Sequence, residues 1–147
     1  MTERPILADV DVWLASTVAA HPHHDAARRW WADEVLPSGS KVAFCRVTQL
    51  GLLRLLTNKS VMGRQRQTIA EAWEHYDRIA SQAMITYVDE PPALSEQLRH
   101  LSASGRSSKN FWTDAYLAAF AQSCNFRLVT FDGGFKKFPV LELTVLR

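Results

Sequence analysis

Near its start the chain reads Pro5-Ile6-Leu7-Ala8-Asp9-Val10-Asp11-Val12, a short apolar run that ends at a carboxylate. A second run, Arg127-Leu128-Val129-Thr130-Phe131, ends in the same way at Asp132. Short apolar runs of this kind predict buried strands. Because the carboxyl ends of parallel strands meet at the edge of a sheet where ligands bind, Asp9 and Asp132 are expected to lie in one crevice.

Helix-like segments alternate with strand-like ones along the rest of the chain. We expect strands near residues 5–9, 42–44, 85–88, 127–131 and 140–145. We expect helices from Val12 and over residues 23–36, 48–57, 68–81, 91–101 and 111–122, with turns at 37–40 and 133–134 and a loop at 102–109. This alternation predicts an α/β fold with a central, mainly parallel sheet flanked by helices.

Length and composition favour one globular domain that spans residues 1–147. Of these residues 47% are hydrophobic and 22% charged, which excludes a disordered chain. Cys45 and Cys124 lack metal-type spacing and are expected to be reduced thiols. No run of 18 apolar residues is present and residues 1–4 do not begin a signal peptide, so a cytoplasmic protein without membrane contact is expected.

The expected helix over residues 111–122 brings a third carboxylate, Asp114, which shares a helix face with Asn110 four residues earlier. Carboxylates gathered in one pocket repel one another, and Mg²⁺, which binds a few carboxylates and keeps several waters, would relieve the repulsion. We predict that Asp9 and Asp114 hold the main ion and that Asp132 supports it or a second ion.

Three polar residues near this pocket have open roles. Asp11 is either the cap of the next helix or a member of the site, and Asn110 or Thr130 is expected to orient water or a ligand. A substrate that carries phosphate groups would also need basic side chains. The candidates are Arg46, Arg54, Lys59, Arg64, Arg66, Lys109, Lys136 and Lys137.

Four blocks together carry a family resemblance: residues 6–12, 47–58, 112–121 and 128–135. In this order they resemble the PIN-domain ribonucleases, and most of all the VapC toxins of bacterial toxin–antitoxin pairs. The resemblance implies a PIN-like three-layer fold and a Mg²⁺- or Mn²⁺-dependent endoribonuclease that cleaves RNA. It also implies a VapB-like antitoxin as inhibitor, a homodimer, and metal-site roles for Asp9, Asp114 and Asp132.

The chain departs from the family pattern at two positions. Gln49 stands where the family usually has Glu, with Gly51 as an alternative match, and Asp11 stands where Asn is common. Gln keeps an acceptor oxygen but loses the charge, which would weaken a second metal site or alter the activation of water. If Gln49 faces the metal pocket, Gln49→Glu should raise cleavage at limiting Mg²⁺. If it points outward, the substitution should change little.

Two other functions remain open at this point. One is a degenerate PIN-like module that binds RNA or a partner without cleavage, which Gln49 favours. The other is a haloacid-dehalogenase-like phosphatase with Asp9 as nucleophile, but Trp13 stands where that family has Thr or Val, and no later lysine motif is convincing. The apolar faces of residues 23–36 and 48–57 also predict a buried homodimer interface.

Overall fold

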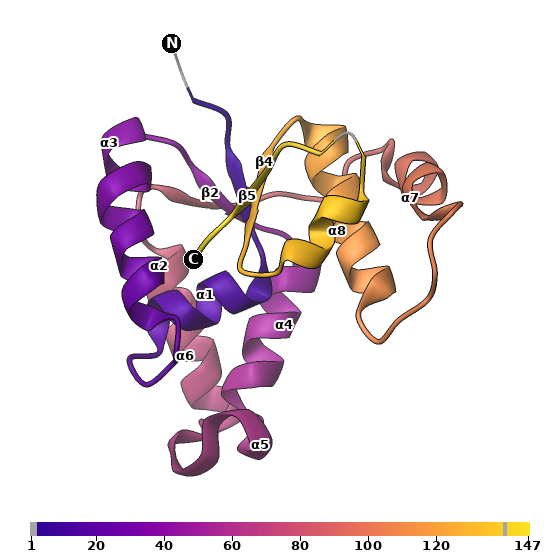
Figure 1. Ribbon diagram of the computed structural model, residues 1–147. Helices are drawn as coiled ribbons and strands as arrows, with labels where there is room; N and C mark the ends of the chain where they lie inside the picture. The colour runs from indigo at the N-terminus through magenta and orange to yellow at the C-terminus, as the bar shows by residue number, and fades with distance from the viewer. Residues whose placement is uncertain (1–2, 140) are drawn as a thin grey trace.

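The computed structural model describes residues 3–139 and 141–147 and contains the predicted parallel sheet (Figure 1). Its five strands lie in the order β3-β2-β1-β4-β5, and every pairing between neighbours is parallel. The strands are β1 (Ile6–Ala8), β2 (Val42–Phe44), β3 (Ile85–Tyr87), β4 (Arg127–Thr130) and β5 (Leu143–Val145). The last strand was expected to begin at Val140, which lies outside the described residues.

Helices cover both faces of this sheet and complete three layers. They are α1 (Val10–Thr17), α2 (His24–Trp30), α3 (Leu36–Ser38), α4 (Arg46–Leu56), α5 (Lys59–Met62), α6 (Ile69–Ala80), α7 (Leu94–Ser102) and α8 (Phe111–Cys124). A π-helical segment, η1 (Trp31–Val35), joins α2 to α3, and two 3₁₀ segments, η2 (Gly63–Gln65) and η3 (Gly133–Lys137), complete the set.

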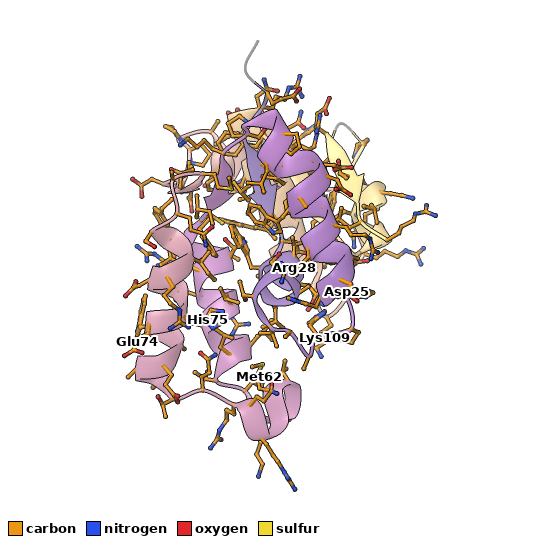
Figure 2. The ribbon with its side chains drawn as sticks, turned by 90° about the vertical axis from the view of Figure 1, so that its left-hand side faces the viewer. Asp25, Arg28, Met62, Glu74, His75 and Lys109 are labelled. Atoms are coloured by element: carbon orange, nitrogen blue, oxygen red, sulfur yellow. The ribbon has the colours of Figure 1, made fainter. Side chains whose placement is uncertain are left out.

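Alternate residues of the strands pack into two separate cores, because successive side chains of a strand point to opposite faces of the sheet. Ile6 and Ala8 point into a core with α1, α2, α4 and α6, in which Trp13 is fully buried. Leu7 points into the other core, with α7, α8 and Phe135 of η3. Figure 2 shows the first of these sides, with Arg28 on α2, His75 on α6 and Met62 at the end of α5.

Several predicted boundaries were wrong, each for a local reason. Asp9 rather than Asp11 caps α1, so the helix begins two residues earlier than expected. The helix predicted over 23–36 continues to Ser38, and its end is set by Gly39 with φ 72°. Pro37 has no N–H for the α-helical pattern, and the chain passes through the wider π segment just before it.

Three further segments differ from the sequence prediction. Gly133-Gly134 was expected as a simple turn but opens the 3₁₀ segment η3. The helix α7 begins at Leu94, after Pro91-Pro92 rather than at them. Residues 59–65, for which no element was predicted, form α5 and η2, with the Asn58 side chain accepting hydrogen bonds from Ser60 and Val61 as the cap.

Strand register brings the functional residues to one edge of the sheet. Leu7 pairs with Ala43 and Ala8 pairs with Val129, so the chain leaves β1, β2 and β4 at the same level. Asp9 follows β1 and donates its backbone N–H to Val129 O at 2.9 Å.

No helix within the described residues is long and apolar enough to cross a bilayer.

Candidate active site

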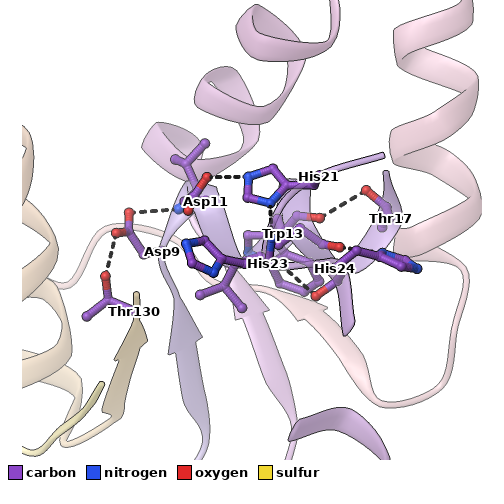
Figure 3. A network of polar contacts seen from close by, with 12 residues as sticks. Asp9, Asp11, Trp13, Thr17, His21, His23, His24 and Thr130 are labelled. Atoms are coloured by element: carbon purple, nitrogen blue, oxygen red, sulfur yellow. Dashed lines mark hydrogen bonds and ion pairs between the residues drawn. The ribbon is translucent and has the colours of Figure 1, made fainter. Parts of the chain in front are cut away.

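Asp9 is held at the junction of β1, α1 and β4 by a hydrogen bond to each of its carboxylate oxygens. Oδ1 accepts the backbone N–H of Val10 at 2.7 Å, which caps α1, and Oδ2 accepts the hydroxyl of Thr130 at 2.8 Å (Figure 3). Thr130 is fully buried, and its Oγ1 also accepts the backbone N–H of Asp132 at 3.0 Å. A single hydroxyl therefore positions two of the predicted acidic residues.

Three of the predicted carboxylates share one electrostatic environment. Burial raises the pKa of Asp9, hydrogen bonds from Thr130 and Val10 oppose the rise, and the charges of Asp11 and Asp132 add to it. Burial also raises the pKa of Asp114 to about 6, with contributions from Asp9 and Asp132 and an opposing one from Lys137. These mutual shifts mean that Asp9, Asp114 and Asp132 lie within electrostatic reach of one another.

The three carboxylates do not form a closed cage. Within residues 3–139 and 141–147, no three acidic, His or Cys side chains are close enough together to hold one ion as they stand. Asp132 caps η3 through Oδ1, which accepts the Gly134 N–H at 2.8 Å, so the cap uses one of its two carboxylate oxygens. The site is therefore an open group of oxygen donors, which suits an ion that keeps several of its waters.

The helix α8 begins at Phe111, as predicted, and carries Asp114 in its first turn. The backbone N–H of Asp114 donates to Asn110 O at 2.9 Å. Asn110 is the exposed N-cap residue and makes no side-chain capping bond. Its side chain thus stays available for water or a ligand.

Asp11 is engaged by a histidine that the sequence prediction did not assign to the site. His21 Nε2 lies 3.0 Å from Asp11 Oδ1, and His21 Nδ1 accepts the backbone N–H of His23 at 3.0 Å (Figure 3). Because Nδ1 is the acceptor, Nε2 carries the proton that is donated to Asp11. The His23 ring stacks on Phe131 with centroids 4.5 Å apart, which ties the α1–α2 connection to the residue before Asp132.

Gln49, the residue at the family's usual Glu position, is buried in α4 and turned towards Arg46 and Tyr76. Its Oε1 accepts a hydrogen bond from Arg46 Nη1. Burial raises the pKa of the Tyr76 hydroxyl, and a hydrogen bond with the Gln49 side chain opposes that rise. Gly51, the alternative match, is a packing position, because a Cβ there would lie 2.5 Å from Val10 Cγ2.

Comparison with known proteins agrees with this arrangement. The family model described as "PIN domain" matches residues 6–141. The chain is 37% identical over 145 residues to ribonuclease VapC41 of Mycobacterium tuberculosis, covering 96% of this chain and 98% of that protein. It is 34% identical over 131 residues to ribonuclease VapC29 of the same organism, covering 88% and 86%.

The fold also matches solved structures. The crystal structure of VapBC2 from Rickettsia felis, bound to a DNA fragment from its promoter, aligns with a TM-score of 0.70 at 15% identity, covering 97% of this chain and 98% of the matched chain. The residues matched by the family model, 6–141, include all four sequence blocks. This chain belongs to the PIN-domain family.

Proposed function

We propose that this protein is a Mg²⁺-dependent endoribonuclease that cleaves RNA phosphodiester bonds and acts as the toxin of a toxin–antitoxin pair. The observation that carries the proposal is the Asp9 carboxylate, fixed by Thr130 and Val10 within electrostatic reach of Asp114 and Asp132. Its relatives VapC41 and VapC29 are named ribonucleases, which supports the same class of reaction.

The donor set fits a hard divalent cation. Asp9 and Asp114 would hold it, with Asp132 in support, and each supplies the oxygen ligands that Mg²⁺ or Mn²⁺ accepts. A bound ion of this kind lowers the pKa of a water and stabilises charge on phosphate oxygens. Burial disfavours the charged forms of Asp9 and Asp114, and a cation would offset that penalty.

The residues around the carboxylates have distinct tasks in this proposal. Thr130 keeps Asp9 in one orientation, and the bond between His21 and Asp11 fixes a further carboxylate beside it. Asn110, exposed at the start of α8, would orient a water or a phosphate oxygen. Positioning of this kind contributes to catalysis because the reacting groups then need no reorganisation in the transition state.

The test is cleavage of single-stranded RNA with Mg²⁺, with Mn²⁺ and with a chelator, alongside a small phosphate monoester as a second substrate. We expect the protein to cleave the RNA but not the monoester, and to do so only when a divalent ion is present. RNA binding without cleavage in any metal would instead favour the non-cleaving module. Hydrolysis of the monoester without RNA cleavage would favour a phosphatase, a function that membership of the PIN-domain family already disfavours.

We further propose a VapB-like antitoxin as the partner and the cytoplasm as the site of action. The Rickettsia felis neighbour is named a VapBC2 structure, and another structural neighbour is FitAB bound to an IR36 DNA fragment. Co-expression with a small reading frame next to the gene should give a complex that co-elutes and cleaves RNA more slowly. A neighbour product that neither binds nor inhibits would contradict this pairing.

We also propose a homodimer, formed through a different surface from the one that the sequence suggested. The apolar faces of residues 23–36 and 48–57 are largely used in the protein's own core, where Trp30, Leu52 and Leu56 are buried. Large apolar side chains that stay exposed on α4, α5 and α6 are Leu50, Val61, Ile69 and Trp73. Light scattering should show a dimer that Trp73→Glu weakens, and a strict monomer at micromolar concentration would contradict it.

A further inference from the structure

The first residue of α4, Arg46, is held in place without being neutralised. Its Nη1 donates to Gln49 Oε1, and its guanidinium carbon lies 5.1 Å from the centroid of the Tyr87 ring. Neither partner carries a negative charge. The ion pair found among the described residues, Arg4–Glu142, does not include Arg46, which is exposed.

The neutral amide of Gln49 suits this arrangement better than a carboxylate would. The side chain is 6% exposed, its Oε1 accepts from Arg46, and it lies close enough to the Tyr76 hydroxyl to oppose the rise in the pKa of that group. An amide can accept and donate at once, whereas a glutamate can only accept and would form an ion pair with the guanidinium. Gln49 therefore fixes the direction of Arg46 and leaves its positive charge available.

The place of Arg46 in the fold is next to the acidic residues but separate from them. It lies just after β2, whose neighbour β1 is followed by Asp9, and Tyr87 ends β3 on the other side of β2. The pKa of Asp9 responds to the charges of Asp11 and Asp132, and the pKa of Asp114 responds to those of Asp9, Asp132 and Lys137; Arg46 is not among these groups. A chain that crosses this edge of the sheet would meet Arg46 one strand away from Asp9.

We propose that Arg46, held by Gln49 and stacked on Tyr87, binds a backbone phosphate of the RNA beside the scissile one, and that Gln49 is a positioning residue for this contact. The inference rests on the proposed ribonuclease function. A guanidinium matches a phosphate with two parallel N–H donors, and stacking on an aromatic ring preorganises its plane. The remaining N–H groups of Arg46 can make such a contact.

The experiment measures binding of a single-stranded RNA by fluorescence anisotropy across a salt series, in an Asp9→Asn background without cleavage. Arg46→Gln should weaken binding roughly fivefold or more and reduce the slope of log K against log salt by about 0.7, the value for one phosphate contact on a single strand. Gln49→Glu should lower affinity and slope in the same direction, because its carboxylate pairs with Arg46. In the cleaving protein, Arg46→Gln should raise KM more than it lowers kcat.

Arg78→Gln is the matched control, since Arg78 is an exposed arginine in the last turn of α6, which leads to the opposite end of β3. Equal losses for Arg46→Gln and Arg78→Gln would overturn the proposal in favour of net charge alone. An unchanged salt slope in Gln49→Glu, with its thermal midpoint retained, would overturn the positioning role. Unmodified protein that neither binds nor cleaves RNA would instead refute the proposed function itself.

Discussion

The Thr130 hydroxyl donates a 2.8 Å hydrogen bond to Asp9 Oδ2, and this contact joins residues 121 positions apart at the ends of two neighbouring strands. Because the same oxygen accepts the Asp132 N–H, the direction of the hydroxyl proton is fixed towards Asp9. The carboxylate that we assign as the main metal ligand is thereby oriented by a side chain that does not itself need to touch the substrate.

Removing this hydroxyl should damage the site without unfolding the protein. Thr130→Val leaves Asp9 Oδ2 and the Asp132 N–H without their buried partner, at a cost of about 1–3 kcal/mol in the free energy of unfolding. The pKa of Asp9 should rise further, because the bond that Thr130 makes opposes the effect of burial. The rate of RNA cleavage should fall, and the acidic side of its pH–rate profile should move to higher pH.

Thr130→Ser is the matched control, since it keeps the hydroxyl and removes only a methyl group. It should cleave RNA with nearly the pH profile of the unmodified protein. If Thr130→Val and Thr130→Ser gave the same profile, the hydrogen bond to Asp9 would have no functional role.

Stability without metal should fall as the pH rises from about 4 to about 6. The pKa of Asp114 is raised from 3.8 to about 6 in the folded protein, so over this window the folded state binds more protons than the unfolded state does. The free energy of unfolding therefore decreases with rising pH, by on the order of 1 kcal/mol for this partly screened group. Asp9 acts in the same direction.

Urea denaturation at pH 4 and pH 7 with a chelator present measures this effect. Asp114→Asn removes the titrating group, so the variant should lose less stability between the two pH values than the unmodified protein. Identical losses of unfolding free energy in both proteins would mean that the surroundings do not disfavour the charged form of Asp114.

Packing between α1 and α4 should tolerate no side chain at residue 51. An added Cβ in Gly51→Ala would lie 2.5 Å from Val10 Cγ2, and Val10 is the residue whose N–H binds Asp9. We expect a loss of about 1–3 kcal/mol in the free energy of unfolding, together with weaker cleavage. Gly133→Ala is the control, because a Cβ at that position meets no atom within 4 Å. The measurement is the thermal midpoint of unfolding of each variant. Equal midpoints for the two variants would contradict close packing at Gly51.

The sheet was predictable from sequence because its strands are short apolar runs separated by amphipathic helices. The segments 42–44 and 68–81 were placed to within a residue or so, and the capping pair of Thr68 and Glu71 marks the start of α6. Residues 59–65 were not predicted, since α5 is one turn long and its cap, Asn58, is equally typical of a loop.

The position of the acidic residues at one edge of the sheet could be predicted from the sequence, whereas the contacts of the polar residues around them could not. Asp9 and Asp132 follow strands of a parallel sheet, so topology alone brings them to one edge. The contact between Asp11 and His21 spans a turn whose shape no periodic pattern encodes. The direction of Gln49 depends on Arg46 and Tyr76, two partners that its position in a helix does not specify.

If a divalent ion held by Asp9 is required for RNA cleavage, Asp9→Asn should remove that activity. Asn is a good helix cap and can still accept from Thr130, so the fold should persist, whereas the lost charge should weaken metal binding. The measurement is the initial rate of RNA cleavage against Mg²⁺ concentration for the unmodified protein, Asp9→Asn and the exposed acid control Asp25→Asn. We predict at least about a hundredfold lower rate for folded Asp9→Asn and an unchanged rate for Asp25→Asn. Full Mg²⁺-dependent cleavage by folded Asp9→Asn would contradict the account.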